Sequence, residues 1–333
     1  MNLMNLRPSF WDPRNIRNPA YRPNLGRAIE EGLRVRGQIM TVSQQAKKGG
    51  KNHGLTLIDY ETDFGDTGRL PVAGTFDDVE RLGERIIRGV IEEHYTHIIA
   101  SIDIHPTEVI HGETWWRDEM GNMPDVSVPL FMTLIDDSDP RRPVFEATWV
   151  DGRPAKKFRP RYMSEHTMNY AKHLTATGQG NIWVFTAHCR QGTDGINLIP
   201  ALAELLEWAS VARGVQVMFM YKGQIAHVDW FGPYRPCMDV PDHPQGGIQT
   251  FYLDINRQCE TMEYTGEAED FCVNAGVRQS IGYYEQEPDM LSRMRFIGDC
   301  TSAIVPGSQV VKDLHRLMKD KGVRVIQHND PFG

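Results

Sequence analysis

The sequence has few cysteines, no excess of positive charge and no long apolar runs. Its 5 cysteines are scattered and include no Cys-x-x-Cys pair, which excludes a disulfide framework and a zinc finger and fits a reducing compartment. The net charge of -8 argues against binding to nucleic acid or to an anionic membrane, because both require a clustered positive field. No apolar run approaches membrane-spanning length, and the first residues lack the pattern of a signal peptide. We therefore expect a cytoplasmic globular protein with small-molecule partners, and the sequence leaves open whether it forms a homo-oligomer.

Apolar, β-branched runs alternate with segments of helical period along most of the chain. The predicted strands are residues 55–58, 98–102, 182–185, 215–220, 295–297 and 323–326. The predicted helices are residues 75–93, with Thr75 as the N-cap, 197–213, and 308–321, which ends before Gly322. This alternation predicts a mostly parallel sheet covered by helices on both faces, that is, one three-layer α/β (αβα) domain of Rossmann-like architecture.

Two segments depart from the alternation. Residues 1–50 are rich in Arg, Lys and Pro, which predicts a solvated N-terminal arm that lies over the domain of residues 51–333 or over a neighbouring subunit. Residues 112–180 are aromatic, proline-rich and charged, which predicts an insertion. Strand-like stretches at 129–135 and 144–150 within it flank a turn cluster and predict a hairpin. The insertion is interpreted either as a lid over a site or as a dimer contact.

A candidate metal site follows the strand at residues 98–102. Asp103 and His105 alternate along an extended chain, and Pro106 then ends the strand and lets the backbone bring His111 back toward them. His188, after another predicted strand, is a candidate fourth ligand, although a buried structural histidine explains it equally well. One carboxylate with imidazoles suits zinc, iron or manganese and does not distinguish among them.

Three further reactive side chains stand at or near the ends of predicted elements. Asp59 follows a buried strand, where desolvation raises the pKa of a carboxyl group and suits it to accept and donate protons near neutrality. Lys222 ends another strand and is followed by a glycine for a tight exit. Cys272 stands where a glycine-bearing turn gives way to a helix, and the helix N-terminus favours a thiolate. Each has a structural alternative, but together they indicate covalent cysteine catalysis beside a metal site.

These motifs resemble the nicotinamidases and pyrazinamidases of the isochorismatase-like cysteine hydrolase family. The resemblance rests on Asp59 in Ile-Asp-Tyr-Glu-Thr-Asp-Phe, Lys222 in Tyr-Lys-Gly and Cys272 in Asp-Phe-Cys-Val, in the family's order. It covers residues 54–111 and 181–328. The residues that fall on the family's metal-ligand positions are Asp103, His105, His111 and His188, the last in a His-Cys step before a Gly-Thr-x-Gly turn.

The resemblance implies one divalent metal ion (zinc, iron or manganese) and a reaction that hydrolyses the linear C–N amide bond of nicotinamide in NAD salvage. Asp59 would take the thiol proton and Lys222 would keep the acid charged. The Cys272 thiolate would attack the amide carbonyl and form a thioester, while the backbone N–H groups of Ala268 and Cys272 stabilise the oxyanion. The metal would bind the pyridine nitrogen. The resemblance also implies a cis peptide bond between Glu267 and Ala268.

The substrate pocket is less well defined by the sequence. Phe64 is a candidate wall, with Trp230 or Trp115 opposite. The sequence departs from the family where Glu267 replaces an apolar residue and where Tyr-Glu-Thr at 60–62 replaces a Gln-Asn turn. Two alternatives therefore remain. One is a cysteine hydrolase of another small amide, and the other is a catalytically silent binding or assembly protein of the same fold.

Overall fold

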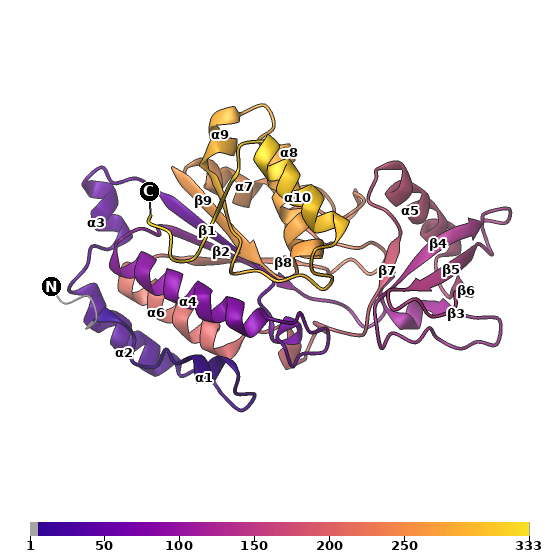
Figure 1. Ribbon diagram of the computed structural model, residues 1–333, viewed down its shortest axis with the longest axis horizontal. Helices are drawn as coiled ribbons and strands as arrows, with labels where there is room; N and C mark the ends of the chain where they lie inside the picture. The colour runs from indigo at the N-terminus through magenta and orange to yellow at the C-terminus, as the bar shows by residue number, and fades with distance from the viewer. Residues whose placement is uncertain (1–5, 333) are drawn as a thin grey trace.

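The computed structural model describes residues 6–332 and is built around a six-stranded, all-parallel sheet (Figure 1). The strands lie in the order β11-β10-β9-β1-β2-β8, and every neighbouring pair is parallel. Their bounds are β1 His53–Ile58, β2 His97–Asp103, β8 Val217–Lys222, β9 Thr261–Gly266, β10 Met294–Ile297 and β11 Arg324–Ile326. The chain runs outward from β1 to β8 and then returns to β9 on the other side of β1. A reversal of this kind opens a crevice at the carboxyl ends of the strands, where α/β proteins bind ligands.

Helices cover both faces of this sheet (Figure 1). One face carries α4 Thr75–Ile91 and α6 Pro200–Arg213, and the other carries α7 Thr250–Arg257, α8 Asn274–Tyr283, α9 Pro288–Arg293 and α10 Gln309–Asp320. A separate cluster of buried apolar side chains lies on each side of the sheet. The predicted three-layer αβα fold is therefore confirmed. No helix among residues 6–332 is long and apolar enough to cross a membrane.

The N-terminal segment lies over the domain, which is one of the two expected placements, but its apolar residues are buried there, which corrects the expectation of a solvated arm. It forms α1 Pro13–Ile16, α2 Leu25–Arg36 and α3 Val42–Lys47, and Figure 1 shows α1 and α2 outside α4 and α6. Phe10 and Trp11 are 4% and 6% exposed and belong to the core on that face of the sheet. The many Arg and Lys residues masked this apolar content, because their long side chains lie on the outer surface while the apolar residues between them pack inward.

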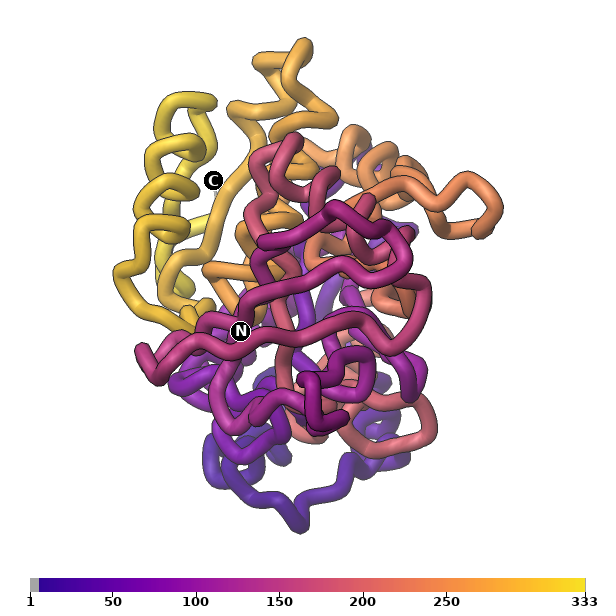
Figure 2. The backbone as a smooth tube through the Cα atoms, turned by 90° about the vertical axis from the view of Figure 1, so that its right-hand side faces the viewer, coloured from indigo at the N-terminus to yellow at the C-terminus, as the bar shows by residue number. Residues whose placement is uncertain are grey.

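A second, five-stranded sheet lies beside the carboxyl ends of the main sheet and faces the viewer in Figure 2. Its order is β3-β6-β5-β4-β7, and all its pairs are antiparallel. The bounds are β3 Trp116–Arg117, β4 Leu130–Asp136, β5 Val144–Trp149, β6 Lys156–Pro160 and β7 Ile182–Val184, and α5 Ser164–Ala176 accompanies the sheet. The predicted hairpin is confirmed as β4 and β5.

Three details of the predicted elements were wrong. The strand at 182–185 is β7, which pairs with β4 in the second sheet and not in the parallel sheet, because Ile182 and Val184 complete the apolar core of the second sheet. Strand β9, next to β1, was not predicted, since its sequence contains the buried, ion-paired Glu263. The N-cap of α4 is Gly74, because the Thr75 hydroxyl donates instead to the carbonyl of Val72.

Candidate active site

Adjacent strands bring three of the predicted side chains to one edge of the sheet. Asp103 and Lys222 are register partners at the ends of β2 and β8, and Asp59 follows β1 on the other side of β2. Asp59 adopts φ 55°, a left-handed conformation that is uncommon for residues other than glycine. The chain leaves β8 through Gly223 at φ 80°, where a Cβ atom would lie 2.5 Å from Oδ1 of Asp103. The glycine predicted after Lys222 is thus required by the backbone conformation and by the approach of Asp103.

The Lys222 ammonium lies at the centre of the cluster. Its Nζ is 2.8 Å from Oδ2 of Asp59, 2.9 Å from Oδ1 of Asp103 and 3.7 Å from the Cys272 sulfur. It also donates to the carbonyl oxygen of Trp230 at 3.2 Å. All four side chains are buried, Cys272 being the most exposed at 7%. One sulfur, one ammonium and two carboxylates therefore meet out of contact with bulk water, where their mutual interactions are strong.

Burial shifts the pKa values of these groups, and the ion pairs oppose or exceed its effect. Desolvation raises the pKa of Asp59, while the charge of Lys222 acts to lower it. Desolvation also raises the pKa of Cys272 well above its usual value, again opposed by Lys222. Burial alone would lower the pKa of Lys222, but the charges of Asp103 and Asp59 hold it well above its ordinary value. Lys222 thus stays protonated, and Asp59 is the group suited to accept the thiol proton.

Cys272 lies on the last turn before a helix, as predicted. It belongs to a π-helical turn, Glu269–Val273, that leads directly into α8. The peptide bond between Glu267 and Ala268 is cis, which confirms the bond expected there. The N–H of Ala268 donates to no acceptor among residues 6–332, so it is free to donate to a ligand.

Three of the four predicted metal ligands converge. Oxygen or nitrogen atoms of Asp103, His105 and His188 all lie within 4.8 Å of one another, and all three residues are buried. Oδ2 of Asp103 is 2.8 Å from Nε2 of His105 and 3.9 Å from Nε2 of His188. His111 stands beside them without joining that set, its ring centroid 4.3 Å from that of His105.

In each of the three imidazoles, Nδ1 faces an oxygen atom. Nδ1 of His105 contacts the carbonyl of Gly223 at 3.1 Å, and Nδ1 of His188 contacts the carbonyl of Thr186 at 2.7 Å. Nδ1 of His111 lies 3.0 Å from a carboxylate oxygen. An acceptor at Nδ1 selects the tautomer whose Nε2 lone pair is available to a metal. Burial lowers the pKa of both His111 and His188, which keeps them neutral and able to coordinate. The residues therefore fit a divalent metal such as zinc.

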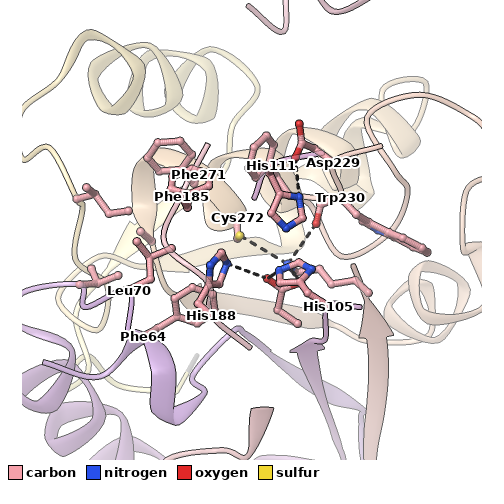
Figure 3. A pocket seen from close by; sticks show the side chains of 16 residues that line it. Phe64, Leu70, His105, His111, Phe185, His188, Asp229, Trp230, Phe271 and Cys272 are labelled. Carbon is pink, nitrogen blue, oxygen red and sulfur yellow. Dashed lines mark hydrogen bonds and ion pairs between the residues drawn. The ribbon is translucent and has the colours of Figure 1, made fainter. Parts of the chain in front are cut away.

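A cavity with about 460 Å³ of space between atoms, its open mouth included, lies against these groups. Its walls are apolar and include Phe64, Phe185 and Phe271 (Figure 3). Trp230 also lines it, but its indole extends away from the Cys272 sulfur and packs in the core of the second sheet. Trp115 does not line the cavity, because its indole is buried in that same core and donates to the hydroxyl of Thr167. An aromatic slot with polar groups at one end suits a flat ring that carries a reactive amide.

Sequence reasoning missed several residues that support the site. Ser101 donates from its hydroxyl to Asp59, and the fully buried Glu61 accepts from the backbone N–H of Asp103. Asp229 supplies the carboxylate beside Nδ1 of His111. The signal for Asp229 was an acid within an apolar run, Val-Asp-Trp-Phe, which is where a buried and partnered carboxylate is expected.

Comparison with known proteins identifies the fold. No protein-family model and no curated protein matches the chain. Among solved structures, a nicotinamidase/pyrazinamidase from Acinetobacter baumanii matches with a TM-score of 0.50 and 19% identity, covering 84% of this chain and 98% of that one. The yeast nicotinamidase Pnc1p matches with a TM-score of 0.50 and 14% identity over 82% and 99% of the two chains. Pnc1p bound to the inhibitor nicotinaldehyde matches with a TM-score of 0.51 and 13% identity over 83% of this chain and 99% of that one. The chain has the fold of the nicotinamidases. It is an isochorismatase-like α/β fold.

Proposed function

We propose that the protein is a metal-dependent cysteine amidohydrolase that converts nicotinamide to nicotinate and ammonia, in NAD salvage. The observation that carries this proposal is the contact of Lys222 with Asp59, Asp103 and Cys272 at the end of an apolar, aromatic-walled cavity. A purely structural ion pair has no need of a thiol, and a buried structural cysteine has no need of an ammonium. The shared fold with nicotinamidases supports the same reaction class.

The residues supply each proton transfer that amide hydrolysis needs. Asp59 removes the proton from the Cys272 thiol, and the sulfur attacks the amide carbonyl carbon. The backbone N–H groups of Ala268 and Cys272 donate to the oxygen as it becomes negative. Asp59 returns the proton to the departing nitrogen, so ammonia leaves and a thioester remains. A water molecule then attacks the thioester, Asp59 takes one of the water's protons and passes it to the sulfur, and the product is released as the carboxylic acid, which ionises to nicotinate in solution.

Four residues would hold the metal: Asp103, His105 and His188, with His111 beside them. When bound, the metal would supply an electrophilic contact for the ring nitrogen of the substrate. Phe64 and Phe185 would confine the ring in the plane that directs its amide toward Cys272. The charge of Lys222 keeps Asp59 ionised at the start of the cycle, despite its burial.

The decisive experiment measures ammonia release from nicotinamide, pyrazinamide and benzamide. We expect turnover of the first two and weaker turnover of benzamide, which lacks a ring nitrogen. Replacement of the nucleophile, Cys272→Ala, should reduce kcat by more than about 10³-fold, because no other group can form the acyl intermediate. Cys259→Ala is the matched control, since Cys259 is also buried but packs beside Gly54 and His97 at the amino ends of β1 and β2 and does not line the cavity.

The control should retain kcat within about twofold of the unmodified enzyme. Full activity of Cys272→Ala would refute the assignment of Cys272 as the nucleophile. Turnover of other small amides but not of nicotinamide would retain the chemistry and replace the substrate. Stoichiometric ligand binding without turnover of any amide would show a silent binding protein.

A further inference from the structure

Of the three acceptors that face the histidine Nδ1 atoms, one is a side chain. His105 and His188 contact backbone carbonyls, whereas His111 contacts the carboxylate of Asp229, Nδ1 to Oδ1, at 3.0 Å (Figure 3). The Asp229 carboxylate is 1% exposed and therefore has little access to solvent. A buried carboxylate persists only where partners compensate its desolvation, and it fixes the orientation of the groups that it touches.

The second partner of Asp229 comes from the insertion. The hydroxyl of Tyr170 on α5 donates to Oδ2 of Asp229 at 3.0 Å and accepts from the backbone N–H of Asp229 at 3.0 Å. Tyr170 is fully buried in the apolar core of the second sheet. One hydroxyl thus holds Asp229 at two points, the carboxylate and the backbone N–H, and Tyr170 itself is buried in the core of the second sheet.

On the other side of this chain of contacts, Nε2 of His111 is buried and has no hydrogen-bond partner within residues 6–332. A neutral imidazole whose Nδ1 faces a carboxylate carries its free lone pair on Nε2. An unpartnered buried nitrogen is costly unless a ligand occupies it. The candidate metal ligands Asp103, His105 and His188 lie next to this ring.

We propose that Asp229 and Tyr170 are positioning residues of the metal site, which act through His111 and through which the insertion increases metal affinity. This inference rests on the proposed metal site. It assigns a task to residues 112–180, none of which lines the cavity as the structure describes it. The insertion then is neither a lid nor only a dimer contact, but the outer support of a metal ligand.

The test is zinc affinity, measured on the metal-stripped full-length protein by competition with a chromophoric chelator. We expect Asp229→Ala to weaken zinc binding by about 10- to 100-fold, as loss of a carboxylate behind a histidine ligand does elsewhere. Tyr170→Phe keeps the ring and should weaken binding by a smaller factor. Asp229→Asn keeps an oxygen that can face Nδ1 and should recover part of the loss. Tyr284→Phe is the control, because it deletes an equally buried hydroxyl that donates to Leu253 away from the cavity.

A double-mutant cycle of Asp229→Ala and His111→Ala tests whether Asp229 affects zinc binding through His111. If Asp229 acts through His111, the double variant binds zinc no more weakly than His111→Ala alone. The spectrum of bound Co²⁺ should change in the same way in Asp229→Ala and His111→Ala, which general loosening of the fold would not produce. Unchanged affinity in both Asp229→Ala and Tyr170→Phe, or full additivity in the cycle, would overturn the inference alone. Failure of the unmodified protein to bind zinc would overturn the metal site itself.

Discussion

At the scale of single residues, the contacts of Lys222 determine which groups of the site can accept a proton. An ammonium that touches two buried carboxylates would leave both uncompensated if it lost its proton. It therefore cannot be the general base at neutral pH. Burial raises the pKa values of both Asp59 and Cys272, and both groups contact the same ammonium. In the proposed mechanism, the proton that passes between them stays within one shielded cluster.

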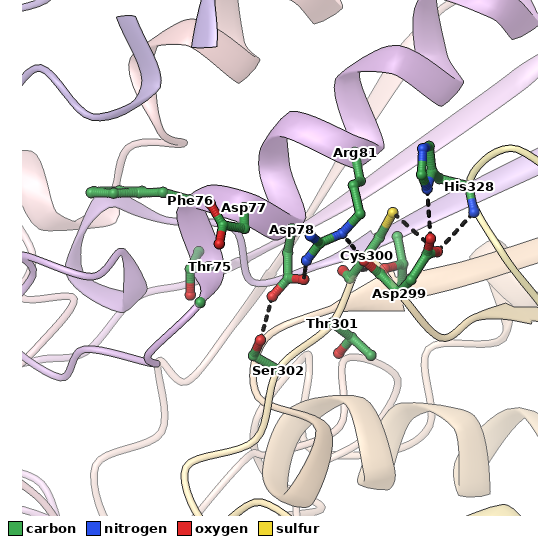
Figure 4. A network of polar contacts seen from close by, with 12 residues as sticks. Thr75, Phe76, Asp77, Asp78, Arg81, Asp299, Cys300, Thr301, Ser302 and His328 are labelled. Carbon is green, nitrogen blue, oxygen red and sulfur yellow. Dashed lines mark hydrogen bonds and ion pairs between the residues drawn. The ribbon is translucent and has the colours of Figure 1, made fainter. Parts of the chain in front are cut away.

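Glu267 is the departure from the family pattern that the structure explains. It is fully buried, and one of its oxygens accepts from the backbone N–H of Ser302 at 3.1 Å. Its other neighbour is Asp78, which contacts the Ser302 hydroxyl and Arg81 (Figure 4). Desolvation, followed by the charge of Asp78, raises the pKa of Glu267 well above its usual value. Burial and the charge of Asp78 therefore favour the neutral form of Glu267 in the folded protein.

This state of Glu267 predicts a pH-dependent stability. A carboxyl group whose pKa is raised by folding contributes stability below its unfolded pKa of about 4.3, and the contribution is lost as pH rises toward the folded value. Glu267→Gln copies the neutral acid without titrating. As pH increases from about 4.3, we expect the free energy of unfolding of the variant to rise relative to that of the unmodified protein, by up to about 1.4 kcal/mol per pH unit. Urea denaturation at several pH values measures the difference.

The comparison needs a baseline for the loss of one carboxylate, which the exposed Glu92→Gln provides. A difference between Glu267→Gln and the unmodified protein that stays constant or shrinks with rising pH would show that Glu267 is ionised in the folded protein.

At the scale of elements, the contact of α2 with α6 decides whether the N-terminal segment is part of the domain. Gly32 faces α6, and a Cβ atom there would lie 2.8 Å from Cβ of Val211 and 3.1 Å from the carbonyl oxygen of Trp208. Neither atom belongs to a flexible chain end, so the two helices would have to separate.

We therefore expect Gly32→Ala to destabilise the protein by about 1–2 kcal/mol, since overpacking outweighs the gain in helix propensity of about 1 kcal/mol. Thermal unfolding of the full chain measures this change. Gly37→Ala is the control, because Gly37 has φ -73° and no described atom within 4 Å of the added methyl group. A stabilised Gly32→Ala variant would mean that α2 does not pack tightly on α6 in solution.

The same scale shows why some elements were predictable. β2 and β8 are apolar runs that end in a polar residue, and β1 is an apolar run that Asp59 follows, so both the strand and the position of its reactive side chain could be predicted from the sequence. β9 pairs with β1 and carries a buried Glu263 whose charge is balanced by Arg85, a residue far away along the chain. β7 is apolar like the others, and nothing local specifies which sheet it joins. Long-range partners settled both cases.

At the scale of the whole molecule, the candidate metal site joins the two sheets. Asp103 ends β2 of the main sheet, and His188 lies just after β7 of the second sheet. The sequence indicated both residues as ligands because their local motifs are distinctive. It did not indicate that they arrive from different sheets, nor that Asp229 and Tyr170 connect the insertion to His111. Those facts depend on how the sheets pack, which residue spacing does not encode.

A ligand set divided in this way predicts that metal binding stabilises both sheets together. At free zinc of about 100 times Kd, binding should stabilise the folded protein by about 2.7 kcal/mol, and a chelator should remove this gain together with amidase activity. Hydrogen exchange should then accelerate both after β2 and after β7, because the metal ties these segments to each other.

Magnesium should restore neither the stability nor the amidase activity that the chelator removes, since it prefers oxygen ligands and two of the three converging ligands are imidazoles. Activity and unfolding temperature that both survive chelation would contradict a functional metal, whereas faster exchange confined to one sheet would contradict the divided site.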